Sequence, residues 1–320
     1  MFEPNVTPLR YLHRSHLGAD AARLYDEISE ALAGGRRFLE FRADESEDFS
    51  AAVLAVQGDD PNFYKLDRRR FITLVTSGGS TEAELHFFYE PERLEEIGRL
   101  LDRTVSRIVG MCGESCSTDY EKELFVHDYL ANNVEYDRSS NAYDHAAQTQ
   151  VGALLEGRAV CEGISKAAAL LLQEAGVDCG CLFNREHMWN VIRLDGEYYH
   201  LDVTWDLRDG YRNMDFFNLT DAVILRDSDH DHRVGPPCTG TEYNWYRRNG
   251  RYFRSEDEIV DAVRAFASSG EPFMDFRYEG VSDSDAKGCV DHAFRTCGDH
   301  PGYRVVSSRV HNTFHIIKTE

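Results

Sequence analysis

Three residues that could carry out acyl-transfer chemistry occur in order along the chain, Cys161, His187 and Asp202. A cysteine nucleophile needs a base that takes its proton, a group that orients the base, and a local field that favours the thiolate. A histidine and an aspartate can supply the first two. The residue types and their order therefore predict attack of Cys161 on a carbonyl carbon, with a covalent thioester as the intermediate.

Cys161 is expected to lie at the start of a helix. Gly157 marks a loop, and an apolar helical pattern begins after Cys161 and ends at Gly176. Unpaired backbone N–H groups and the macrodipole at a helix N-terminus favour an anionic sulfur. Gly163 is expected to let a substrate backbone come close. For Cys161 taken alone, a buried structural cysteine is the alternative.

A β-hairpin is expected to bring the histidine and the aspartate together. Residues 187–194 and 197–203 have the pattern of two strands, and an Asp-Gly pair between them is a strong hairpin signal. With a two-residue loop, Asp202 becomes the diagonal neighbour of His187 on one face, at about 7–8 Å between Cα atoms. Asp202 could then orient the imidazole while its other nitrogen faces the thiol. A slip of one residue would put the two side chains on opposite faces.

Five motifs in order, at the expected spacing, point to a known family. They are Val134-Glu135-Tyr136-Asp137, Gly157-Arg158-Ala159-Val160-Cys161-Glu162-Gly163, His187-Met188-Trp189-Asn190, Leu194-Asp195-Gly196-Glu197-Tyr198-Tyr199 and Asp202-Val203-Thr204-Trp205-Asp206. The run from about Tyr120 to about Leu225 resembles the transglutaminase-like superfamily, of the microbial type, a branch of the papain-like cysteine enzymes. The resemblance implies Cys161 as nucleophile, His187 as base and acid, and Asp202 as the orienting group.

The resemblance leaves the reaction partly open. Met188 stands where the family usually has alanine or glycine, which puts substrate access in doubt. The oxyanion donor could be the Cys161 backbone N–H, the side chain of Gln148 or Gln150, or an aromatic residue. Water as acceptor makes a peptidase or amidase, an amine makes a transglutaminase, and the three candidate residues do not decide between them. The alternative function is a non-catalytic peptide-binding module that retains the fold.

The expected fold class is α+β. The resemblance implies a papain-like core, in which the helix carrying Cys161 packs on an antiparallel sheet carrying His187 and Asp202. Two smaller α/β modules are expected to flank this core. The expected division is an N-terminal α/β module at 1–110, a transglutaminase-like catalytic core at 111–235, and a C-terminal α/β module at 250–320 that resembles the first.

The resemblance between the outer modules comes from a gapless alignment of residues 24–43 with 259–278. The matching pairs are Asp26 with Asp261, Gly35 with Gly270, Phe38 with Phe273, Phe41 with Phe276, and Arg42 with Arg277. Further on, the segment 58–61 matches 298–301. The alignment suggests two related helix–strand–helix–strand units, with a chance similarity of two ordinary α/β segments as the alternative. In the N-terminal part the elements are expected at 20–33, 38–41, 46–57, 70–76, 83–89 and 91–109.

Composition and charge exclude some classes of partner. The 320 residues are 42% apolar, enough for a sizeable core, and the net charge of −21 argues against nucleic acid and anionic membranes. No apolar run is long enough to span a membrane. Neither a secretory signal nor a disulfide-rich pattern is visible, so a cytoplasmic protein is expected; a mature chain whose signal had been removed would look the same. A peptide or protein substrate is the expected partner, and no oligomeric state is indicated.

No cofactor or metal is expected. The segment 227–232, Asp-Ser-Asp-His-Asp-His, offers oxygen and imidazole ligands at dense spacing. It lacks the glycine that turns a calcium loop, so a polar loop is the preferred interpretation, and a metal-dependent hydrolase is the weaker one. Cys112, Cys116, Cys179 and Cys181 lack the usual spacing of zinc ligands and are expected to be buried thiols.

Overall fold

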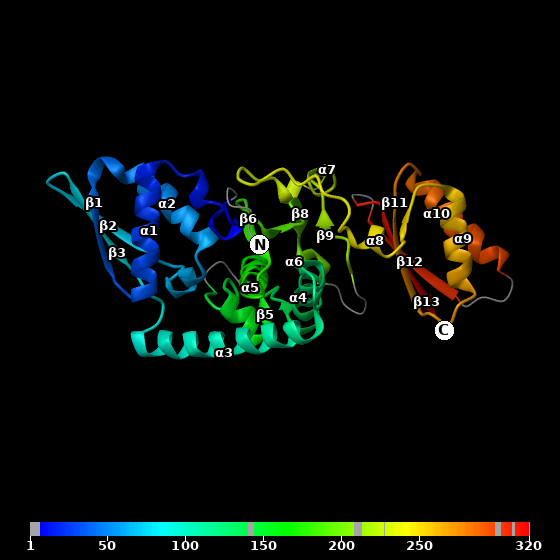
Figure 1. Cartoon of the computed structure of the whole chain (residues 1–320), viewed down its shortest axis with the longest axis horizontal. Coiled ribbons are helices and arrows are strands. Elements are labelled where there is room, and N and C mark those ends of the chain that lie inside the picture. The colour runs from blue at the N-terminus through cyan, green and yellow to red at the C-terminus, as the bar shows by residue number, and fades with distance from the viewer. Residues whose placement is uncertain are drawn as a thin grey trace.

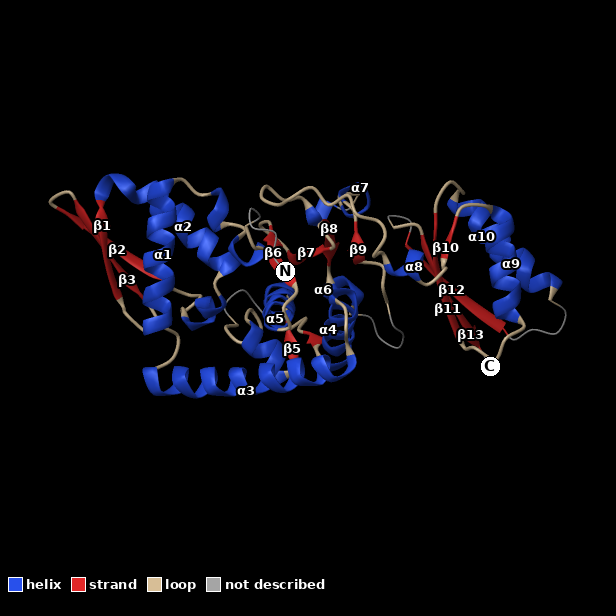
Figure 2. Ribbon diagram, viewed as in Figure 1, coloured by secondary structure: helices blue, strands red, loops and turns tan. Residues whose placement is uncertain are grey.

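The computed structural model describes residues 7–139, 144–207, 213–226, 228–297, 302–308 and 311–319. The fold mixes helices and sheets, and three groups of elements follow one another along the chain (Figures 1 and 2). In Figure 1 the N-terminal elements are blue, the central elements green, and the C-terminal elements orange and red. Each group has a hydrophobic core of its own. The residues expected to do chemistry lie in the central group.

The first group packs two helices against a three-stranded antiparallel sheet. Its elements are α1 (Ala19–Gly34), β1 (Phe38–Arg42), α2 (Ser46–Asp59), β2 (Ile72–Ser77) and β3 (Ser80–Leu85), with the strands in the order β1-β3-β2. Apolar residues at helical spacing, among them Leu24, Ile28 and Leu32, form the buried face of α1. The helix ends at Gly35, whose φ of 69° is the left-handed conformation that glycine adopts easily.

A long helix, α3 (Pro91–Ser115), joins the first group to the central one. It begins with Pro91, which suits the first helical position because it has no N–H to leave unpaired. Leu101 packs near Tyr64 of the first group, whereas Val105 and Ile108 belong to the central core. Figure 1 shows α3 running beneath both groups, so one apolar stripe supports the two of them.

The central group packs α5 (Cys161–Glu174) against a four-stranded antiparallel sheet. The strands are β6 (Asp178–Phe183), β7 (Met188–Leu194), β8 (Glu197–Leu201) and β9 (Phe217–Leu219), in that order. Helix α4 (Asp119–Asn133) also packs on α5. Two short strands, β4 (Glu135–Tyr136) and β5 (Arg158–Ala159), pair in parallel directly before α5. This pairing fixes the approach of the chain to Cys161.

The predicted hairpin register is confirmed. Leu194 pairs with Glu197 and Asn190 pairs with Leu201, as a two-residue loop requires. Asp195 and Gly196 both have positive φ values, 48° and 88°, which is the geometry of the tight turn that matches strand twist. Both strands are shorter than expected: β7 begins at Met188, one residue after position 187, and β8 ends at Leu201, two residues before position 203.

The C-terminal group repeats the layout of a small sheet covered by two helices. Its elements are α8 (Trp245–Arg248), β10 (Tyr252–Phe253), α9 (Glu256–Ala267), β11 (Phe273–Tyr278), α10 (Asp283–Thr296), β12 (Gly302–Ser308) and β13 (Thr313–Thr319). The strand order is β10-β11-β13-β12, with β10 parallel to β11 and the other pairs antiparallel. Apolar side chains of α9 and α10, including Ile259 and Phe294, fill the space beneath the sheet.

The two outer groups share one topology. In each, a helix, a strand, a second helix and two antiparallel strands follow in order, and β1-β3-β2 corresponds to β11-β13-β12. The strands of the aligned segments begin at equivalent residues, Phe38 and Phe273. The second part of the expected match, 298–301, lies outside the described residues. Common ancestry and the proposed domain limits stay predictions.

Short elements complete the chain and hold parts of the site. They are η1 (Leu9–Tyr11), η2 (Arg14–His16), η3 (Ala43–Glu45), η4 (Pro61–Lys65), η5 (Gly152–Glu156), α6 (Val203–Asp206), α7 (Asp221–Ile224) and η6 (Ser228–His230). The strand expected at 83–89 is β3 instead, which begins earlier because the Gly78-Gly79 turn leads directly into it. Helix α3 continues six residues beyond its expected end. Among the described helices, none is both long and apolar enough to cross a bilayer.

Candidate active site

Cys161 is the first residue of α5, and its side chain is half-buried rather than sealed in the core. The preceding residue, Val160, has extended backbone angles, and Gly157 has a φ of 69° that turns the chain into β5. The first N–H groups of a helix have no partner within the helix and carry partial positive charge. Cys161 therefore lies at the helix start that its sequence pattern predicts.

Gly163 has a different role from the one expected. A Cβ at this position would lie 2.7 Å from the carbonyl oxygens of both Ala147 and Thr149, and 2.9 Å from the Cβ of Ala159. The close approach is thus by the protein's own loop before α5 and not by a substrate backbone. The expectation of a substrate contact at Gly163 is wrong, because the loop occupies that space. The glycine lets the loop pack on the helix beside Cys161.

His187 and Asp202 meet at one end of the hairpin. His187 directly precedes β7, and Asp202 follows β8 as the N-cap of α6, where it accepts a hydrogen bond from the Trp205 N–H at 3.2 Å. The Nε2 atom of His187 lies 2.5 Å from Oδ2 of Asp202. The His187 side chain is 9% exposed, and that of Asp202 is fully buried. The second ring nitrogen of His187 remains for Cys161, which is close enough to contribute to the raised pKa of this imidazole.

Opposing effects set the charge state of this pair. Burial disfavours the charged imidazole, but the charge and hydrogen bond of Asp202, with the contribution of Cys161, raise the pKa of His187 to about 10. Burial also opposes ionisation of Asp202, yet the charges and hydrogen bonds of His187 and His230 hold the pKa of Asp202 well below its usual range. A carboxylate and an imidazolium are therefore the favoured forms at neutral pH.

Two exposed aromatic side chains border the pair. Tyr136, in β4, is 41% exposed, and burial together with the charges of Cys161 and Asp202 raises the pKa of its hydroxyl. Trp205, in α6, is 37% exposed and meets the His187 ring edge to face, with centroids 6.3 Å apart. Large aromatic surfaces that remain exposed beside a reactive group can hold a substrate chain.

Sequence reasoning missed a second histidine on the carboxylate. The Nε2 atom of His230, in η6, lies 2.9 Å from the same Asp202 oxygen that faces His187. His230 is completely buried, and its ring stacks on Phe216 with centroids 5.5 Å apart. The only available signal was the His-rich segment 227–232, which was interpreted as a loop. Position 227 itself lies outside the described residues.

A neighbouring group includes the other histidine of that segment. His232 lies beside His200 and Asp221, so His230 and His232 turn toward different carboxylates. The His200 ring accepts a hydrogen bond at Nδ1 from the Trp189 indole N–H, which can only donate. The proton of a neutral His200 is therefore on Nε2, which donates to Asp221 at 2.8 Å.

Two groups of three residues have the donor types for a metal ion, His187, Asp202 and His230 in one and His200, Asp221 and His232 in the other. In both groups the carboxylate already accepts imidazole N–H groups. Binding of an ion by His200 would also require loss of its Nε2 proton while Nδ1 stays occupied by the indole. The donor sets thus fit hydrogen-bonded networks better than cation sites.

The first group of elements helps to hold the start of α5. Glu162, next to Cys161, is buried and forms ion pairs of 2.8 Å with both Arg68 and Lys166. Burial opposes ionisation of Glu162, but these two cations lower its pKa overall. Gln57 of α2 donates to the same carboxylate at 3.4 Å. This buried contact, which sequence reasoning missed, fixes the first turn of α5 against the N-terminal elements.

Several other candidate residues lie away from the site chemistry. Gln150 is buried and its Nε2 donates to the Pro61 carbonyl at 2.6 Å, which turns the amide toward the N-terminal group and away from an oxyanion at Cys161. All eight cysteines are free. The four that were considered as zinc ligands do not form a group with metal-binding geometry among the described residues, and burial raises the pKa of Cys179 and Cys181.

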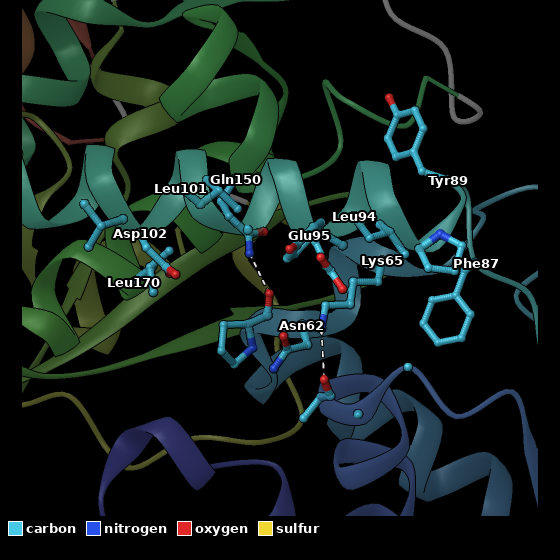
Figure 3. A pocket seen from close by; sticks show the side chains of 18 of the residues that line it. Asn62, Lys65, Phe87, Tyr89, Leu94, Glu95, Leu101, Asp102, Gln150 and Leu170 are labelled. Atoms are coloured by element: carbon cyan, nitrogen blue, oxygen red, sulfur yellow. Dashed lines mark hydrogen bonds between the residues drawn. The ribbon is translucent and has the colours of Figure 1, made fainter.

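A cavity of about 720 Å³ lies on another part of the molecule. It is bounded by the end of α1, by η4 and by the first half of α3, and Figure 3 shows Lys65, Glu95, Asp102 and Gln150 around it. Cys161, His187 and Asp202 do not line this cavity. The candidate site therefore lies outside this cavity.

Comparison with protein families agrees with the motifs. Residues 107–203 match the core model of the transglutaminase-like superfamily, and this match confirms the resemblance expected from the sequence. Cys161, His187 and Asp202 all lie inside the matched segment. None of the curated proteins that were compared matches the chain.

Solved structures give weaker likenesses. A TGase crystal structure is 14% identical, with 44% of this chain and 46% of that chain covered and a TM-score of 0.31. A proposed cysteine protease from Cytophaga hutchinsonii is 13% identical, with 42% and 61% covered and a TM-score of 0.26. Menin, whose structure reveals a binding site for Mixed Lineage Leukemia protein, is 12% identical, with 64% and 41% covered and a TM-score of 0.28. The chain spans less than two thirds of each, and TM-scores this low carry no argument.

Proposed function

We propose that the segment of this chain that belongs to the transglutaminase-like superfamily, residues 107–203, catalyses cysteine-dependent acyl transfer on peptide or carboxamide substrates. One observation carries the proposal. The His187 imidazole is hydrogen-bonded to a buried carboxylate, Asp202, and lies close enough to Cys161, at the start of α5, for the thiol to contribute to its raised pKa. A pure binding module would have no need to bury a carboxylate in order to hold a ring against a half-exposed thiol.

The proposed reaction begins with the Cys161 sulfur as a thiolate next to the His187 imidazolium. The sulfur attacks the carboxamide carbonyl, and the carbonyl oxygen takes the negative charge of the tetrahedral intermediate. His187 gives its proton to the departing nitrogen, so an amine or ammonia leaves and a thioester remains on Cys161. The now neutral His187 takes a proton from the acceptor, which attacks the thioester and restores the thiolate. Asp202 keeps the ring oriented and stabilises its charged form.

Two groups are positioned to stabilise the oxyanion in this scheme. The Cys161 backbone N–H lies at the helix start, where N–H groups are free to bind an anion. Tyr136, a half-exposed residue, is the second candidate; burial first, and then the charge of Cys161, raise the pKa of its hydroxyl. Gln150 is not proposed for this role, because its amide is committed to Pro61.

The products formed from glutamine peptides would test the proposal. We expect one of three mass changes when the full chain is incubated with a glutamine peptide library, with and without a primary amine. Amine incorporation with loss of ammonia indicates transamidation, deamidation alone indicates an amidase, and backbone cleavage indicates a peptidase. Each of these changes should disappear in Cys161→Ala and persist in Cys116→Ala, which alters another half-buried cysteine.

Unaltered peptides would contradict the enzyme proposal. If the library is neither cleaved nor modified, while some peptides bind with the same affinity to wild-type protein and to Cys161→Ala, the non-catalytic binding module is the better account. A product that forms equally well in Cys161→Ala would assign the chemistry to another group.

A further inference from the structure

A carboxylate oxygen shared by two histidines stands out within the candidate site. His187 and His230 both direct Nε2 at Oδ2 of Asp202, at 2.5 and 2.9 Å. An ionised carboxylate can only accept, so both nitrogens carry protons. The backbone N–H of Trp205 donates a hydrogen bond to the other oxygen, Oδ1. Donors on both oxygens restrict rotation of the carboxylate, and a carboxylate held in one plane holds the His187 ring in one plane.

The ring of His230 is itself held firmly. It meets the rings of His187 and Trp189 edge to face, both with centroids 5.1 Å away, and it stacks on Phe216. Its Nδ1 is buried without a hydrogen-bond partner among the described residues. A proton on Nδ1 would thus be buried without an acceptor, whereas the tautomer with its proton on Nε2 satisfies the contact with Asp202. The surroundings therefore favour donation from Nε2 of His230 to Asp202.

One side chain connects the segment carrying His230 to the turn carrying His187. The Nδ2 atom of Asn184 donates to the carbonyl oxygens of Asp229 and Asp231, the two neighbours of His230, at 2.8 and 3.0 Å. Its Oδ1 atom accepts the backbone N–H groups of Glu186 and His187 at 2.8 and 2.9 Å. The two histidines therefore have a common anchor, and the distance between them is fixed by the backbone as well as by Asp202.

We propose that His230 is a positioning residue which, anchored by Asn184, fixes the Asp202 carboxylate and thereby holds the His187 ring against Cys161. This inference rests on the proposed function, since it assigns a role within the same site. The titratable groups that face His187 and Asp202 are Cys161, Tyr136 and His230. His200 and His232 are further titratable groups near His230, and their rings contact each other.

The test compares alkylation of individual cysteines by iodoacetamide, measured by peptide mass spectrometry. Cys116 and Cys297 are the other half-buried cysteines and serve as internal references. A thiol paired with an imidazolium reacts faster than an ordinary thiol at mildly acidic pH, and this advantage disappears at alkaline pH, where ordinary thiols ionise. The rate of Cys161 relative to Cys116 at mildly acidic pH thus reports the pairing with His187. The rate at alkaline pH reports access to Cys161.

The decisive variants are His230→Met and His230→Gln, which have side chains of similar length and differ in the N–H donor. In His230→Met, we expect the alkylation rate of Cys161 relative to Cys116 at mildly acidic pH to fall about tenfold, the effect of removing one hydrogen bond to a charged acceptor. The rate at alkaline pH should be unchanged. In His230→Gln, this relative rate should stay within about threefold of the wild-type value, because the glutamine amide can still donate a hydrogen bond. His232→Met, in the same segment but not in contact with Asp202, should resemble the wild type.

The outcomes separate the two proposals. In one outcome, Cys161 of the wild type is alkylated faster than Cys116 at mildly acidic pH, and this difference disappears in His187→Ala but is unchanged in His230→Met. The positioning role is then wrong and the proposed function stands. If wild-type Cys161 reacts like Cys116 at every pH, both are wrong. Should His230→Met fail to fold, imidazole nitrogen NMR of the wild-type protein decides instead. A proton on Nδ1 of neutral His230, rather than on Nε2, would overturn the inference.

Discussion

His187 lies between a carboxylate that favours its proton and a protein interior that disfavours it. The effect of the carboxylate on the pKa of His187 is the larger one, because the hydrogen bond and charge of Asp202 act at 2.5 Å while the ring retains slight exposure. The result is a ring that stays charged through neutral pH beside the Cys161 sulfur. The charge of the ring beside Cys161 is thus maintained by a buried carboxylate, Asp202.

This raised pKa makes the stability of the protein depend on pH in a defined direction. The pKa of His187 is about 10 in the folded state, against an ordinary value near 6.5, so its protonated form favours folding. The contribution is complete below pH ~6.5 and is lost as the pH rises through about 10. We expect the free energy of unfolding of the wild type to exceed that of His187→Gln by about 1–3 kcal/mol at pH 6, and by less at pH 10.

Urea unfolding of both proteins across this range would measure the difference. Groups that titrate in both proteins cancel in the comparison, which isolates His187. A difference that stays constant from pH 6 to pH 10, or that grows with pH, would contradict the assigned charge state.

At the scale of elements, the start of α5 depends on a loop that lies against it. The carbonyls of Ala147 and Thr149 approach Gly163 so closely that no side chain fits between them. Glu162, one residue earlier, is fixed by Arg68 and Lys166. The position of Cys161 is therefore set from two sides, by the loop before the helix and by the first group of elements.

Two glycine substitutions in helices would test this packing. Gly163→Ala should lower the free energy of unfolding by about 1–3 kcal/mol, the usual effect of overpacking, because its Cβ would meet backbone oxygens at 2.7 Å. Gly110→Ala in α3 is the matched control, since nothing lies within 4 Å of its added Cβ. It should raise stability by about 0.5–1 kcal/mol through helix propensity. Equal effects of the two substitutions would contradict the role of the loop.

The same elements show what the sequence can and cannot predict. The Asp195-Gly196 turn specifies the hairpin register from local residues alone, which is why the meeting of His187 and Asp202 could be predicted. The contact of His230 with Asp202 could not. It joins residues 28 positions apart through a segment without helical or strand periodicity, and Asn184 fixes it by binding backbone carbonyls, which no side-chain pattern reports.

On the scale of the whole molecule, the outer groups attach to the central one through buried polar contacts. At the C-terminal side, Asp215 accepts hydrogen bonds from the Tyr246 hydroxyl at 2.7 Å and from His315 at 3.1 Å, and Arg277 donates to its backbone carbonyl. At the N-terminal side, Arg68 forms an ion pair with Glu162, the residue after Cys161. The sequence predicted three parts but not these links, because buried ion pairs between distant segments leave no local pattern. Experiments on the site should therefore use the full chain.

The most direct measurement is trapping of an acyl-enzyme. We expect acid quenching of the full chain, shortly after mixing with a reactive glutamine peptide, to leave the acyl group on the peptide that contains Cys161, as a thioester that hydroxylamine removes. The adduct should be absent in Cys161→Ala and greatly reduced in His187→Ala. Turnover of the peptide with no adduct at Cys161, or with an adduct that forms equally well without His187, would contradict the proposed function.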